Sequence, residues 1–138
     1  MDRLQIWTDG SCVCGLGGWG AVVIGKTGKV LRMKGGERNT TNNRMEMTAP
    51  LMALLEISEH RHGLPIVVIS DSQYLVNTMT RGWRRNKNLD LWHQLDQVVA
   101  LHTVDWEWVR GHSGVQFNEE ADRLANQGRE ELTYVELT

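Results

Sequence analysis

The sequence predicts an α/β domain built on a mixed β-sheet. Three strand-like segments come first along the chain, and a long helix, a buried strand, two helices, a fifth strand and a final helix follow them. With 138 residues, 41% of them hydrophobic, the chain is long enough to bury a core of its own. We therefore expect residues 1–138 to form a single domain, with a flexible tail over about residues 130–138.

The first three strands are predicted by alternating apolar and polar side chains. Residues 4–9 alternate in this way, and the strand is expected to end at Asp9 because a turn-like Gly-Ser pair follows. The glycine-rich residues 15–18 predict a loop. Residues 19–26 and 29–35 then predict two strands joined as a hairpin.

The later elements include a helix that should be central to the fold. It is predicted from about Asn43 to His60, where apolar side chains recur on several faces. Pro50 lies inside this helix and predicts a local bend, because proline has no N–H to donate to the carbonyl of Glu46. The other predicted elements are a buried strand at 66–69, a short helix capped by Ser72, a helix at 89–101, a strand at 104–108, and a last helix at about 118–127 that stops at Gly128.

Composition and charge limit the classes of function. Lysine and arginine total 15 against 17 aspartates and glutamates, and the net charge of -2 argues against a protein that holds nucleic acid through bulk positive charge. The chain has no apolar run of about 18 residues, so we expect no association with a membrane. Cys12 and Cys14 are too few for a disulfide framework and predict reduced thiols in a cytoplasmic protein.

Four carboxylates are placed where they can meet. Asp9 and Asp71 each follow a predicted strand, while Glu46 and Asp122 lie near the starts of two helices. Each alone has an ordinary explanation as a turn residue, part of a capping box, a helix cap or a surface charge. As a set they would repel one another without a cation, and such oxygen ligands suit Mg²⁺ or Mn²⁺. Two ions about 4 Å apart drive phosphoryl transfer, so the set predicts a metal-dependent phosphodiesterase.

Five segments resemble, in the same order, the motifs of type 1 ribonuclease H. The resemblance implies cleavage of the RNA strand of an RNA–DNA hybrid by a monomer, leaving a 5′-phosphate and a 3′-hydroxyl. It also implies a sheet of three antiparallel strands followed by two parallel strands, flanked by helices. The matching segments are Thr-Asp-Gly-Ser-Cys at 8–12, Thr-Asn-Asn-Arg-Met-Glu at 41–46, Ser-Asp-Ser-Gln-Tyr at 70–74, Trp-Glu-Trp-Val-Arg-Gly-His at 106–112, and Asn-Glu-Glu-Ala-Asp at 118–122.

The resemblance also implies catalytic roles by position. Asp9, Glu46, Asp71 and Asp122 match the metal-binding carboxylates of the family, which implies two Mg²⁺ ions, with Mn²⁺ as a substitute. His112 matches a histidine on a mobile loop that assists catalysis or product release. Alternatively, His112 is an ordinary surface residue of a glycine-flanked loop.

Contacts with the hybrid are implied at five further positions. Cys12, Asn42, Asn43 and Gln73 match residues that contact the minor groove, where short polar groups reach 2′-hydroxyls. Thr41 resembles a residue that helps to seat a DNA phosphate. The two asparagines have an alternative role as helix caps.

Two departures from bacterial members concern substrate binding. The segment after Asp9 is shorter and lacks an Asn of the phosphate pocket, and the long basic handle is missing. Trp83, Arg84 and Arg85 remain either as a reduced handle or as part of a solvated loop whose Trp packs on the core. Two other functions stay open here, a non-catalytic hybrid-binding module and a related nuclease that acts on DNA. A non-catalytic module would be expected to lack at least one of the four acidic residues, and none of them is missing here.

Overall fold

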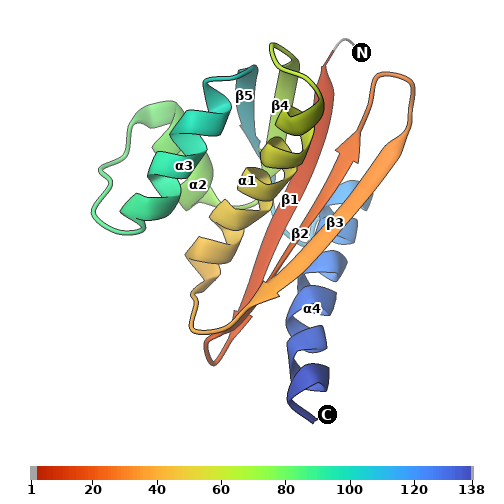
Figure 1. The fold of residues 1–138 in the computed structure, drawn as a ribbon, viewed down its shortest axis with the longest axis vertical. Helices are drawn as coiled ribbons and strands as arrows, with labels where there is room; N and C mark the ends of the chain where they lie inside the picture. Colours follow the sequence, from red (N-terminus) through yellow and green to blue (C-terminus); the bar gives the residue numbers. More distant parts are fainter. Residues whose placement is uncertain (1–2, 138) are drawn as a thin grey trace.

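The computed structural model describes residues 3–137, and their side chains as far as residue 132. Within this part of the chain, five strands form one sheet that is flanked by four helices (Figure 1). The elements in chain order are β1 (Leu4–Val13), β2 (Leu16–Ile24), β3 (Val30–Glu37), α1 (Asn42–His60), β4 (Pro65–Ser70), α2 (Gln73–Arg81), α3 (Leu89–Val99), β5 (Thr103–Trp108) and α4 (Gln116–Leu137).

The sheet has the mixed topology that the sequence predicts. Its strand order is β3-β2-β1-β4-β5, with β1, β2 and β3 antiparallel and β4 and β5 parallel to β1. Helices α1 and α3 lie on one face, and α4 crosses the opposite face (Figure 1). Among the described helices, none combines the length and hydrophobicity that a bilayer span requires.

The main core lies between the sheet and the pair α1 and α3. Ile6 and Val68 of the central strands pack there with Met47, Leu54 and Trp92, all of them fully or almost fully buried. A smaller cluster on the opposite face packs α4 against β2. Strand β1 is therefore covered on both faces, and the polar groups that it carries are held on a rigid support.

Strand β1 is longer than predicted, so the turn expected after Asp9 is wrong. The strand continues to Val13, and the actual turn is formed by Cys14 and Gly15, whose φ angles are 51° and 78°. The loop predicted at 15–18 is also wrong, because β2 begins at Leu16. Parallel pairing between β1 and β4 nevertheless stops at the Thr8–Ser70 pair. Asp9 thus lies where the neighbouring strand ends, although its own strand does not.

The predicted stop of the last helix at Gly128 is wrong as well. A Cβ atom at this position would lie 2.1 Å from the carbonyl oxygen of Gly35, so the glycine allows α4 to pack on β3. The helix continues to Leu137, and Lys34 forms an ion pair with Glu131 at 2.6 Å. Residues 130–137, where the sequence predicts a flexible tail, are therefore helical, and Thr138 lies outside the described residues.

The two helices that precede the site begin with hydroxyl caps. Thr41 caps α1 by accepting a hydrogen bond from the Arg44 N–H at 3.3 Å. The alternative role of Asn42 and Asn43 as caps is therefore wrong, and their side chains are available to the neighbouring pocket. Ser72 caps α2 as predicted. Pro50 lies inside α1, and the bend predicted there stays a prediction.

Candidate active site

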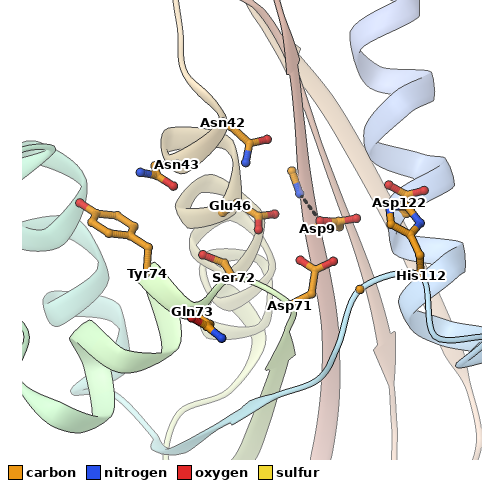
Figure 2. A pocket seen from close by; sticks show the side chains of 12 residues that line it. Asp9, Asn42, Asn43, Glu46, Asp71, Ser72, Gln73, Tyr74, His112 and Asp122 are labelled. Atoms are coloured by element: carbon orange, nitrogen blue, oxygen red, sulfur yellow. Dashed lines mark hydrogen bonds between the residues drawn. The ribbon is translucent and has the colours of Figure 1, made fainter.

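A pocket of about 410 Å³ opens beside the point where β1 and β4 separate (Figure 2). All four predicted carboxylates and His112 contribute to its lining, although they come from different elements. The structure therefore brings together residues that are up to 113 positions apart, from Asp9 to Asp122. The lining residues are Asp9, Gly10, Asn42, Asn43, Glu46, Asp71, Ser72, Gln73, Tyr74, Gly111, His112 and Asp122.

Three of the carboxylates form a tight group. Asp9, Glu46 and Asp71 each offer an oxygen within 4.8 Å of the others. Asp9 and Glu46 are only 5% exposed. Gly10 permits this approach, because a Cβ atom there would lie 2.5 Å from the backbone nitrogen of Glu46. The start of α1 thus rests directly on the backbone of β1.

Asp122 joins the pocket from the opposite side of the sheet. It lies on α4, next to His112 in Figure 2, and is not part of the group within 4.8 Å. It is close enough to Asp9 to help raise the pKa of that carboxyl. The structure therefore places Asp122 at the margin of a group formed by the other three.

The group is electrostatically unfavourable without a cation. Burial raises the pKa of Asp9 to about 8, and Asp71 and Asp122 add to this shift, against the opposing hydrogen bonds from Glu46 and the Gly10 N–H. Burial also raises the pKa of Glu46 well above its usual range, with the neighbouring Asp9 and Asp71 as further causes. One buried oxygen of Glu46, Oε1, has no hydrogen-bond partner among the described residues.

These observations fit a hard divalent cation. The ligands are carboxylate oxygens, which Mg²⁺ and Mn²⁺ prefer. A cation would neutralise the mutual repulsion and give the orphaned Glu46 oxygen a partner. Asp9, Glu46 and Asp71 would hold it, and Asp122 is placed to contribute from the margin.

The loop that carries His112 passes directly over Asp71. A Cβ atom at Gly111 would lie 2.7 Å from Oδ2 of Asp71, so a larger residue at that position would have to displace this carboxylate. His112 has a left-handed backbone with φ of 54° and is exposed. The Gly114 N–H donates to the Glu119 carboxylate at 3.1 Å and ties the loop to α4. The imidazole is thus presented to the pocket from outside the carboxylate group.

The predicted substrate contacts are distributed unevenly. Asn42, Asn43 and Gln73 line the pocket, whereas Cys12 and Thr41 do not. The Cys12 thiol instead contacts the carbonyl oxygen of Thr40 at 3.5 Å. The three polar side chains lie on the side of the pocket opposite to Asp122 and His112 (Figure 2).

The basic segment after α2 divides into engaged and free cations. The Arg85 guanidinium pairs with Asp96 at 2.5 Å and lies 5.0 Å from the centroid of the Trp92 ring. Its charge is therefore already paired inside the protein. Arg84 has no ion-pair partner among the described side chains. It lines a neighbouring pocket with Asn43 and other residues.

Tyr74 and Trp108 support the site, although the sequence did not single them out. The Tyr74 hydroxyl accepts hydrogen bonds from Asn88 at 3.2 Å and from Trp92 at 3.3 Å. The Trp108 indole N–H donates to the main-chain carbonyl of Asp71 at 3.0 Å. Both lie inside motifs that match the family, but their roles depend on partners distant in the sequence.

The fold and the carboxylate group together define a metal-dependent nuclease. Residues 1–130 match the sequence model of the RNase H family. The ribonuclease H of Pseudomonas aeruginosa strain LESB58 is 44% identical over 146 residues, covering 95% of this chain and 96% of that protein. Among solved structures, LC9-RNase H1, a type 1 RNase H with the type 2 active-site motif, is 33% identical with a TM-score of 0.81, covering 95% of this chain and 74% of that chain.

A further solved structure, LC11-RNase H1 in complex with an RNA/DNA hybrid, shares the fold at 18% identity. Its TM-score is 0.81, and the match covers 95% of this chain and 99% of that chain. The chain belongs to the ribonuclease H family, whose members depend on divalent metal ions. It is an endonuclease for the RNA strand of RNA–DNA hybrids, as the resemblance of its motifs implied.

Proposed function

We propose that the pocket lined by Asp9, Glu46, Asp71 and Asp122 cleaves the RNA strand by hydrolysis with two Mg²⁺ ions. The products would be a 5′-phosphate and a 3′-hydroxyl. The observation that carries this proposal is the group of three carboxylates within 4.8 Å of one another, with a buried Glu46 oxygen that lacks a partner. Mn²⁺ should substitute, because it has the same preference for oxygen ligands.

When bound, the ions supply charge neutralisation and activate water for attack on the phosphodiester. The protein's own contribution is to hold the carboxylate ligands in place before the ions bind. The Gly10 N–H donates to Asp9 at 2.9 Å and fixes one carboxylate. The indole of Trp108 and the close passage of Gly111 fix the backbone and the side chain of Asp71. Because burial raises the pKa of both Asp9 and Glu46 when no metal is bound, metal binding should release protons.

His112 is proposed to move a proton at the edge of the pocket. Histidine is the side chain best suited to gain and lose a proton near neutral pH. Its place on an exposed loop over Asp71 lets it approach the departing group without entering the buried carboxylate group.

The polar side of the pocket is proposed to hold the hybrid. Asn42, Asn43 and Gln73 would read the minor groove, and short amide side chains can reach 2′-hydroxyls there. Cys12 and Thr41 lie outside the lining and would act only on the strand beyond it, where Thr41 would meet a DNA phosphate.

The basic segment after α2 is proposed as a small backbone-binding surface. Arg84 is free to meet a DNA phosphate, and Trp83 is 46% exposed. Arg85 would act as a positioning residue, since its guanidinium holds the segment to α3 through Asp96. The free thiols of Cys12 and Cys14 support a cytoplasmic location, and a pocket completed by one chain supports a monomer.

A direct test assays one labelled RNA–DNA hybrid beside duplex DNA and duplex RNA, with and without Mg²⁺. We expect cleavage of the hybrid alone, only with metal, and its loss in Asp71→Asn with the circular dichroism spectrum unchanged. Glu107→Gln, which removes an exposed carboxylate outside the pocket, is the matched control and should keep activity. Mg²⁺-dependent cleavage by the Asp71→Asn variant would contradict the assignment. Binding without cleavage, or cleavage of duplex DNA, would favour the two other functions.

A further inference from the structure

A second pocket, of about 340 Å³, lies beside the active site and has an unusual lining. It combines two indoles, two carboxamides and one guanidinium, a set of groups that suits nucleic acid. Gln73, Asn77 and Arg81 come from α2, Trp83 follows this helix, and Trp108 ends β5.

The two tryptophans expose large aromatic surfaces. Trp83 is 46% exposed and Trp108 is 43% exposed, so the fold leaves nearly half of each side chain in water. Arg81 forms no ion pair with any described side chain, in contrast to Arg44 and Arg85, which are both paired with aspartates. The pocket therefore offers free aromatic surface and an unneutralised positive charge at the same place.

This pocket adjoins the carboxylate site. Gln73 lines both pockets. The Trp108 indole, which lines the second pocket, donates its N–H to the main-chain carbonyl of Asp71. A strand that lies across the carboxylates and leaves over Gln73 would enter the second pocket directly.

We propose that this pocket binds an unpaired nucleotide of the RNA strand, where that strand leaves the hybrid. An indole can stack only on a base whose face is free, and bases inside a duplex already stack on their neighbours. Trp83 and Trp108 would stack on the base, and Arg81 would pair with its phosphate. The enzyme would therefore favour hybrids next to single-stranded RNA. This inference rests on the proposed function, because it takes the carboxylate pocket as the place of cleavage.

The test compares a short blunt hybrid with the same hybrid carrying a single-stranded RNA extension at its 5′ or 3′ end. Binding is measured without metal, so that cleavage does not interfere. We expect the wild-type protein to bind one of the two extended hybrids about tenfold more tightly than the blunt hybrid, so that the ratio of the two affinities is about ten. Trp83→Ala should bring this ratio close to one, and Trp83→Phe should keep most of it. Arg81→Ala should lower the ratio and make it less dependent on salt.

Arg61→Ala is the matched control for the charge. Arg61 caps the far end of α1, is exposed and is unpaired among the described side chains, so its loss should leave the ratio unchanged. A wild-type ratio of one would overturn the inference, as would a ratio that Trp83→Ala and Arg81→Ala both retain. Fluorescence gives a second measurement, since the extended hybrid should quench wild-type tryptophan emission more than the blunt hybrid does. Failure of the proposed function would instead appear as no Mg²⁺-dependent cleavage of the blunt hybrid by the wild-type protein.

Discussion

Replacing Glu46 by glutamine should stabilise the protein in metal-free buffer while abolishing cleavage. The change removes one charge from the buried group and keeps the size of the side chain. Two unit charges at 4.8 Å, the outer limit of the group, repel by about 3.5 kcal/mol at an effective dielectric constant of about 20. This is the repulsion within one charged pair, and the variant gains it only where Glu46 is ionised, because a protonated Glu46 carries no charge to remove.

The gain should depend on pH, and its sign follows from the two raised pKa values. Because Asp9 and Glu46 hold protons more tightly in the folded state, their contribution to stability is fully present below about pH 4. It is lost as the pH rises through the folded-state pKa, about 8 for Asp9. Near pH 5 the variant and the wild type should therefore be almost equally stable. Near pH 9 the variant should be more stable by about 2–3 kcal/mol.

Urea unfolding in the presence of EDTA at about pH 5, 7 and 9 measures this difference. The melting temperature should follow, at roughly 3 °C for each kcal/mol in a domain of this size. Glu107→Gln removes an exposed charge and should show no such trend. Adding Mg²⁺ should reverse the order, because the ion stabilises the wild-type fold by binding it. A difference that does not grow with pH, or a wild type that is more stable without metal, would refute the reasoning.

Three other predictions concern packing, titration and binding. Gly128→Ala should destabilise the fold by about 2–3 kcal/mol in urea unfolding, because its Cβ atom would lie 2.1 Å from a β3 carbonyl oxygen, whereas Gly25→Ala has room and should cost far less. Burial, with the neighbouring His62, lowers the pKa of His102, so stability should fall as the pH drops below about 6.5, and a His102→Asn variant should lose this dependence. Arg84→Ala should reduce the slope of log affinity for the hybrid against log salt by about one, and a slope as steep as in handle-bearing enzymes would contradict the idea of a small basic surface.

Strand and helix patterns allowed most of the fold to be predicted. The apolar run at 66–69 is a buried strand, and Ser72 caps the helix after it, because both features depend on neighbours along the chain. Glycines were harder to interpret. Gly10 resembles a turn residue and Gly128 resembles a helix stop, yet each is a point of close contact between a helix and a strand. Local sequence cannot distinguish these roles, since the partner lies far along the chain.

For the candidate site, the sequence predicted most of the residues but not how they are arranged. The motifs placed all four carboxylates in one pocket, but they did not show that Asp122 stands outside the tight group, because α4 approaches from the opposite face of the sheet. Arg85 was expected to contact substrate, and its pairing with Asp96 depends on how α3 folds back against the segment. Trp108 carried no local signal, since its partner is a main-chain carbonyl 37 residues away.

The contact at Gly10 has a consequence for how the enzyme tolerates change. The spacing between Asp9 and Glu46 is set where two peptide backbones touch, and a backbone contact has no rotamers to exchange. Loosening the hydrophobic core elsewhere should therefore lower the melting temperature well before it weakens the affinity for metal. Catalytic geometry and global stability can therefore change independently in this protein. Many core substitutions should yield enzymes that unfold more easily but are fully active while folded.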